Sequence, residues 1–225
     1  KVHHNELQYI TEISLKSPAT MIPQAKNELK RMADMAQENL DRSIKGFLNQ
    51  SDEYLNKIYH REEDINNVSH AITDYLVKSN QLSLPLADQK ILGSMFYVVN
   101  DIERIGDHAV NICDYTKLIE EKHIVFSDDA KQQMEEMKMI CEKMFHNISK
   151  EPDDTQAWLQ KVHDSENFID QKTEEFYESH LERINKGECN DEACIIFSEM
   201  LTDFERIGDH TWNVAKQMAK IIERG

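Results

Sequence analysis

The sequence has few of the residues that interrupt helices. It contains only 6 glycines and 4 prolines in 225 residues, so turns are scarce and helices should be long. Strand signals are essentially missing, and apolar residues recur at helical spacing along most of the chain. We therefore predict an all-α protein, with enough residues for one large domain or two small ones.

Other missing features exclude whole classes of function. No apolar run approaches the roughly 18–20 residues that cross a membrane, and no signal peptide is visible, so we expect a cytoplasmic location. The formal net charge of −16 repels nucleic acid and acidic lipid, which predicts no nucleic-acid partner. The sequence also lacks a nucleophile motif and a glycine-rich phosphate loop. We therefore predict that it is not an enzyme.

The cysteines form no Cys-x-x-Cys pair. The four are Cys113, Cys141, Cys189 and Cys194. Free thiols in a reducing compartment are the first expectation, and a disulfide or a thiolate metal site is the second.

The strongest positive signal is an internal repeat. Residues 101–108 read DIERIGDH and residues 203–210 read DFERIGDH, and an asparagine follows three residues later in both copies, at Asn111 and Asn213. A shared helix preference would repeat apolar positions but not this set of charged residues. The repeat therefore predicts two homologous halves, each with one acidic site.

Helical geometry groups the acidic residues of each copy. Glu103 and Asp107 are related as i and i+4 and share a helix face, as do Glu205 and Asp209. Such like-charged pairs destabilise an isolated helix by roughly 0.2–0.5 kcal/mol. A repeated cost of this kind suggests a compensating positive charge, either a neighbouring arginine or a bound cation.

The motif glycines give a second indication. Gly106 and Gly208 lie in the middle of predicted helices, where glycine costs about 1 kcal/mol relative to alanine. Their use at the same place in both halves predicts that another helix, or a ligand, approaches closely there.

The predicted layout is two tandem three-helix bundles. A lead-in segment covers residues 1–20, the first bundle covers 21–124 and the second covers 125–225. The helices are expected at about 23–48, 51–78, 85–122, 127–150, 153–185 and 191–223.

The second helix of each half offers further acidic residues. Glu63 and Glu166 are separated by almost the same interval as the main motifs, and we predict that they form the other wall of each site. The polar residues that share their helix faces are His60 and Asn67 in the first half, and His163 and Asp170 in the second. The alternative is that these are exposed polar faces.

Facing carboxylates would suit hard or borderline cations, and carboxylates readily bridge two metals. If the helices face each other, each half could hold a multinuclear iron, zinc or manganese cluster. A ferritin-like di-iron enzyme would require Glu-x-x-His on two helices, and that pattern is missing. The competing interpretation is an ion-pair network in which Arg104 and Arg206 bind the carboxylates and pin adjacent helices.

The repeated phrase Glu-Arg-Ile-Gly-Asp-His, on the third helix of each half, resembles the PhoU family of phosphate-transport regulators. This resemblance covers about residues 20–225. It implies an acidic motif in each half that binds multinuclear iron or zinc clusters in some members, with manganese or magnesium ranked below these metals. The matching positions are Glu103 and Asp107, and Glu205 and Asp209.

The beginning of the chain resembles a different member of the family. Ser17-Pro18-Ala19, Gln24-Ala25, Glu28 and Met32 look like the connector after the membrane part of sodium/phosphate cotransporter-like proteins. We therefore expect a regulatory domain whose partner is a transporter membrane domain. A free-standing PhoU-type regulator is the alternative, followed by a carboxylate-bridged metalloenzyme and a plain helical scaffold, and a homo-oligomer is left open.

Overall fold

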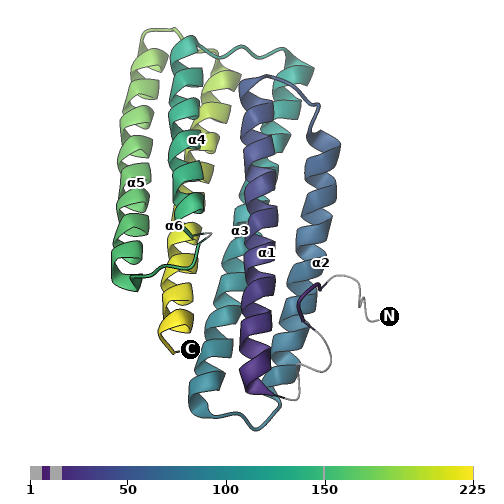
Figure 1. The fold of residues 1–225 in the computed structure, drawn as a ribbon. Helices are drawn as coiled ribbons and strands as arrows, with labels where there is room; N and C mark the ends of the chain where they lie inside the picture. The colour runs from purple at the N-terminus through teal and green to yellow at the C-terminus, as the bar shows by residue number, and fades with distance from the viewer. Residues whose placement is uncertain (1–6, 11–16, 149, 225) are drawn as a thin grey trace.

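The computed structural model describes residues 7–10, 17–148 and 150–224. Within these residues the regular structure is entirely helical, which confirms the all-α prediction (Figure 1). The helices run roughly parallel or antiparallel to one another and give an elongated body. Their bounds are α1 Pro18–Leu48, α2 Leu55–Asn80, α3 Leu86–Lys122, α4 Asp128–Ile148, α5 Thr155–Asn185 and α6 Asp191–Arg224.

Several helix ends follow directly from the local sequence. The Ser127 hydroxyl accepts a hydrogen bond from the Ala130 backbone N–H at 3.1 Å, at the start of α4. The Asp154 carboxylate caps α5 by accepting from the backbone N–H groups of the second and third residues after it. Gly187 follows α5 with φ +70°, a conformation that glycine adopts without a steric penalty.

The start of α1 differs from the sequence prediction. Helix 1 was expected to begin near Pro23, but it begins at Pro18, and Pro23 lies inside it. Met21 and Ala25 are fully buried, so the apolar stripe of the helix already begins in this first turn. This burial offsets the backbone hydrogen bond that an internal proline cannot donate.

The two bundles share one hydrophobic core. Helices α1, α2 and α3 pack together, as do α4, α5 and α6, and the halves meet where α3 packs on α6 and α1 packs on α4. Buried apolar residues from both halves form one continuous cluster. The tandem three-helix architecture is therefore confirmed, and the division at residues 20, 124 and 125 stays a prediction.

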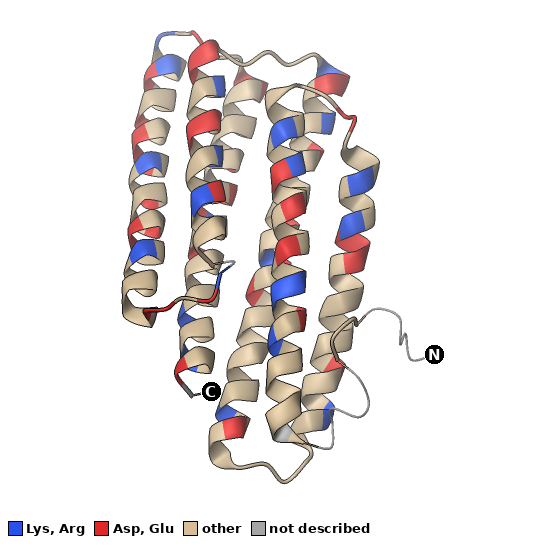
Figure 2. Cartoon of the chain, in the orientation of Figure 1, with Lys and Arg blue, Asp and Glu red and all other residues tan. Residues whose placement is uncertain are grey.

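Charge is spread over the surface. Figure 2 shows acidic and basic residues interspersed along the visible helices. No helix in the described part of the chain is long and apolar enough to cross a membrane.

The cysteines depart from the first expectation. Cys189 and Cys194 are joined in a disulfide, with their Cα atoms 6.1 Å apart. Free thiols were expected at all four positions, and only Cys113 and Cys141 have them, both in buried positions.

The two motif glycines lie where helices approach each other closely. A Cβ at Gly106 would be 3.0 Å from Oε2 of Glu62 on α2. A Cβ at Gly208 would be 3.2 Å from Cδ1 and 3.3 Å from Cγ2 of Ile169 on α5. The prediction that another helix approaches at these positions is therefore confirmed.

The difference between these two contacts gives a matched prediction. Gly208→Ala should lower the free energy of unfolding by about 1–3 kcal/mol, because the fully buried Ile169 cannot move away without disturbing the core. Gly106→Ala should cost less, because a flexible carboxylate can rotate away and alanine favours a helix by about 1 kcal/mol. Chemical denaturation of both variants measures this, and equal destabilisation would contradict it.

Candidate metal centre

The acidic site of the second half lies between α5 and α6. Glu166 and Asp170 come from α5 and Asp209 comes from α6, and one carboxylate oxygen from each lies within 4.8 Å of the others. Glu166 is buried, with 8% of its surface exposed, whereas Asp170 is open to solvent. The structure therefore brings together the three residues that the sequence predicted from two different helices.

The crowding of these carboxylates shows in their electrostatics. Burial, followed by the adjacent Asp170 and Asp209 carboxylates, raises the pKa of Glu166 to about 8. Burial and the same two neighbours also raise the pKa of Glu205 on α6, and Arg206 opposes the shift. Glu205 thus belongs electrostatically to the cluster.

The acidic site of the first half lies between α2 and α3. Its members are Glu62 on α2 and Glu103 and Asp107 on α3. Burial, followed by the adjacent Asp107 and Glu103 carboxylates, raises the pKa of Glu62 to about 8. The Ser69 hydroxyl of α2 donates a 2.8 Å hydrogen bond to Glu103. Oε2 of Glu62 is buried and has no hydrogen-bond partner among the described residues.

Glu62 replaces the predicted Glu63. The Glu63 side chain is 78% exposed and lies 3.9 Å from His60 of its own helix, outside the acidic site. The glycine contacts give the correct alignment of the halves, because Ile65 lies against Gly106 as Ile169 lies against Gly208. Three residues earlier, this alignment pairs Glu62 with Glu166. The sequence prediction was one residue out, and one residue rotates a helical side chain by about 100°.

The same alignment explains why the two sites differ in charge. Asn66 is the counterpart of Asp170, whereas Asn67, which the sequence had placed there, is exposed. The first site therefore has three carboxylates, Glu62, Glu103 and Asp107, and the second has four. The first half is therefore the poorer of the two in carboxylates.

The motif arginines do not neutralise these carboxylates by direct pairing. Arg104 and Arg206 are both exposed. No ion pair joins either of them to a carboxylate in the ranges that the structure covers. The interpretation of the motif as an arginine–carboxylate network therefore loses its main support.

The other polar residues of the motif bind the two halves together, a role that sequence reasoning missed. Nδ1 of His108 on α3 lies 2.7 Å from Oδ1 of Asp203 on α6, and Nδ1 of His210 lies 2.9 Å from Oδ1 of Asp101. The two imidazole rings stack with centroids 5.7 Å apart. Asn111 donates a further hydrogen bond to Asp203 at 3.1 Å. We call this arrangement the reciprocal His–Asp contact.

A signal for this contact was present in the sequence. Aspartate and histidine of each motif lie off the carboxylate row, so the motif presents polar groups to two directions. Because the copies are identical at these positions, each half can supply both the donor and the acceptor that the other needs. The reciprocal His–Asp contact could have been predicted by treating the two copies of the motif as partners of each other rather than as separate sites.

The acidic sites have the chemistry of cation sites. Each site offers several oxygen donors from two helices, and in the first site Oε2 of Glu62 is buried and unpartnered. Burial, followed by neighbouring carboxylates, raises the pKa of Glu62 and of Glu166. Hard and borderline metals prefer such donor sets. A cation would be held by Glu62, Glu103 and Asp107 in the first half, and by Glu166, Asp170, Glu205 and Asp209 in the second.

The raised pKa of Glu62 predicts how the metal-free protein responds to pH. The folded state holds an extra proton between the ordinary value of 4.5 and about 8, so stability falls as pH rises through that window. Glu62→Gln removes the ionisation. At pH 8 we expect this substitution to raise the free energy of unfolding of chelator-treated protein by at least about 1 kcal/mol, which raises its melting temperature by about 2–4 °C. Near pH 4.5 the melting temperature should change little.

Glu63→Gln is the matched control for that measurement. It changes the same charge on the next residue, whose side chain is exposed. Thermal melts that show the same pH dependence for both variants would contradict the assignment of Glu62 to the site.

The reciprocal His–Asp contact predicts unequal costs for its two aspartates. Asp203→Ala leaves His108 and Asn111 without their acceptor and should lower the free energy of unfolding by about 1.5–3 kcal/mol. Asp101→Ala affects His210 alone and should cost less. Denaturant titration tests this order, with Glu121→Ala on the exposed side of α3 as control; a cost for Asp203→Ala no larger than for the control would refute it.

Comparison with known proteins shows which family the chain resembles. The PhoU domain family matches the chain twice, over residues 29–116 and 134–218, once in each half. A curated relative is the phosphate-specific transport system accessory protein PhoU homolog 1 of Thermotoga maritima. It is 22% identical over 199 residues, which cover 87% of this chain and 84% of the relative.

Solved structures agree with the fold. The crystal structure of PhoU from Pseudomonas aeruginosa has a TM-score of 0.79 at 15% identity, over 89% of this chain and 96% of that one. The phosphate transport system regulatory protein PhoU from Streptococcus pneumoniae has a TM-score of 0.77 at 15% identity, over 92% and 97% of the two chains. With the family matching both halves over more than half of the chain, this protein belongs to the PhoU family.

Proposed function

We propose that this chain is a non-catalytic regulator of inorganic phosphate transport whose two acidic sites bind metal cations. The observation that carries the proposal is the double match to the PhoU domain, with an acidic cluster between two helices in each matched half. The relative from Thermotoga maritima is named as an accessory protein of a phosphate-specific transport system. Regulation would act through contact with the membrane part of a transporter, from the cytoplasm.

The comparisons favour a PhoU-type accessory protein over a cotransporter domain. The relative and both solved PhoU proteins align over 84%, 96% and 97% of their own lengths. We therefore adopt the PhoU-type phosphate uptake regulator, which was the alternative expectation, as the proposed function.

The acidic sites supply the proposed means of regulation. Clustered carboxylates repel each other when ionised, and a bound cation removes the repulsion and draws the two contributing helices together. Iron or zinc is the proposed metal, because the family resemblance implies it and carboxylates can bridge such ions. The second site, with one more carboxylate, should bind more tightly than the first.

Metal content after chelator-free purification tests the cation sites. Asp209→Asn should remove the metal of the second site and Asp107→Asn that of the first, so the double variant should hold neither. Glu63→Gln is the control and should retain all of it, since its side chain is exposed. Elemental analysis that finds no metal in any form, or the same stoichiometry in the double variant as in the unchanged protein, would contradict the proposal.

Phosphate uptake tests the regulatory role separately. Deleting the gene, or this domain from its parent, should change how phosphate uptake differs between phosphate-rich and phosphate-starved cells. Supplying the unchanged protein should restore the original difference. If the metal sites carry regulation, the variant with both Asp107→Asn and Asp209→Asn should fail to restore it while remaining folded. Unchanged uptake in the deletion would remove the regulatory proposal. Metal-dependent hydrolysis of a phosphoester by the purified chain would replace it with an enzyme.

A further inference from the structure

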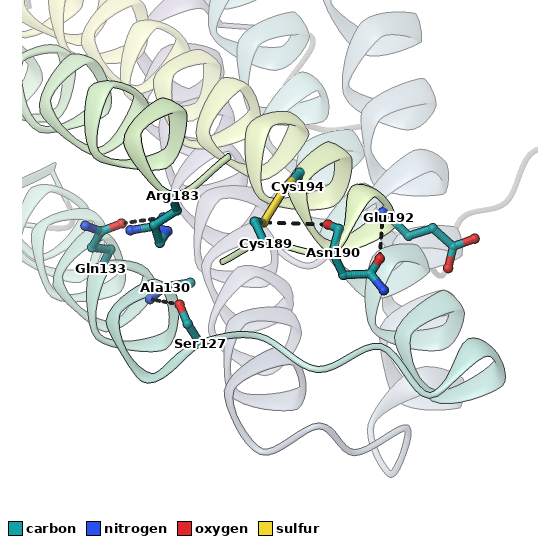
Figure 3. Close-up of a disulfide and its surroundings, with 8 residues drawn as sticks. All are labelled: Ser127, Ala130, Gln133, Arg183, Cys189, Asn190, Glu192 and Cys194. Carbon is teal, nitrogen blue, oxygen red and sulfur yellow. Dashed lines mark hydrogen bonds between the residues drawn. A yellow bond between two sulfur atoms is a disulfide. The ribbon is translucent and has the colours of Figure 1, made fainter. Parts of the chain in front are cut away.

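The end of α5 and the start of α6 bring together three residues that neither acidic site uses. They are His180 on α5, Cys189 in the connection, and Cys194 in the first turns of α6. A ring nitrogen of the histidine and both sulfur atoms lie within 4.8 Å of one another. Figure 3 shows the two cysteines joined at this end of the second bundle.

The histidine provides an independent sign of a missing ligand. His180 is only 2% exposed, and its Nδ1 is buried without a hydrogen-bond partner among the residues the structure describes. An orphaned polar atom in such a position costs free energy unless another group binds it.

A small cavity lies beside two of these three residues, His180 and Cys189. A cavity of ≈30 Å³ is lined by His180, Cys189 and Asn190, among others. This volume exceeds the roughly 10–15 Å³ that one water requires. With bonds of about 2.3 Å to sulfur and about 2.0 Å to nitrogen, tetrahedral zinc holds its ligand atoms about 3.5–3.8 Å apart. The ligand atoms of this cluster lie within 4.8 Å of one another, and the two sulfurs can take up the zinc spacing once they are no longer bonded to each other.

The disulfide should contribute little to the stability of the fold. It joins cysteines with a sequence separation of 5. A cross-link over so short a loop restricts the unfolded chain less than one over a long loop. It also leaves the buried histidine nitrogen unexplained.

We propose that the reduced form of this cluster is a zinc site, in which His180, Cys189 and Cys194 bind one Zn²⁺ and a water completes the tetrahedron. Two thiolates balance the charge of the dication, and imidazole and thiolate are the ligands that zinc prefers. The N-terminus of α6 adds a partial positive charge that favours anionic sulfur there. This site is separate from the acidic clusters and does not depend on the proposed function.

Oxidation opposes metal binding at the same two sulfurs. A dithiol reductant transfers two electrons and two protons to the Cys189–Cys194 disulfide, and the reductant itself becomes a disulfide. Zn²⁺ then displaces the two thiol protons. A disulfide oxidant reverses the exchange, forms the S–S bond again and releases the ion as Zn²⁺. The site therefore binds zinc only in the reduced protein.

Cobalt titration of the full chain tests the proposal, because Co²⁺ substitutes for zinc and absorbs light through its thiolate bonds. The protein is reduced with a phosphine, freed of excess reagent without oxygen, and titrated. We expect one equivalent of Co²⁺ with thiolate-to-metal absorption, which Zn²⁺ then abolishes, and no such absorption in the disulfide form. The carboxylate sites contain no sulfur and contribute nothing to this signal.

Variants identify the ligands. Cys189→Ser and Cys194→Ser should each weaken or abolish the absorption. His180→Gln removes a direct ligand and should weaken affinity by at least about tenfold, the smallest loss typical even of groups that only support a ligand. Cys113→Ala, which removes a thiol elsewhere, should change nothing. Absorption that is missing from the reduced unchanged protein, or undiminished in both serine variants, would overturn the proposal.

A second measurement needs no substitution. In the reduced unchanged protein, Zn²⁺ should protect Cys189 and Cys194 from alkylation, as read by peptide mass spectrometry, and a chelator should restore their reactivity. Equal alkylation with and without Zn²⁺ would also overturn the proposal.

Discussion

The packing of α3 against α6 is the contact on which the rest of the molecule depends. Each helix supplies one aspartate and one histidine, so that His108 binds Asp203 while His210 binds Asp101. These side chains lie largely out of solvent, with exposures of 19% and 6% in the first pair and 20% and 12% in the second. Breaking a partly buried pair of this kind leaves polar groups without partners, so the contact specifies how the two halves sit together.

One short motif performs two structural tasks because a helix presents its residues in different directions. In the first copy, Glu103 and Asp107 point toward α2, where Glu62 meets them, and Asp101 and His108 point toward the other half. Gly106 lets α2 approach closely beside this row. A cation between α2 and α3 would thus act on the same helix that joins the halves. This gives a direct physical route from the acidic sites to the interface, through α3 in one half and α6 in the other.

Much of this could be predicted from the sequence because the repeat and the helical period are local properties. The all-helical fold, the two acidic rows and the close approach at both glycines all follow from spacing within one helix. Prediction failed where two helices had to be placed against each other. Glu63 was chosen over Glu62 because both are glutamates. Only the position of α3 decides which of the two faces the acidic site. The His–Asp partners were missed for the same reason. The Cys189–Cys194 disulfide was ranked behind free thiols. Helix α1 begins before Pro23 because tertiary burial of Met21 outweighs a local break signal.

Crystallography of the metal-loaded protein, with an anomalous difference map collected at the absorption edge of the bound metal, tests the central claim most directly. The account predicts metal density between α2 and α3, held by Glu62, Glu103 and Asp107. It predicts further density between α5 and α6, held by Glu166, Asp170, Glu205 and Asp209, with the higher occupancy there. Density held by Glu63 instead, or no density at either cluster while metal is present in the crystal, would contradict it.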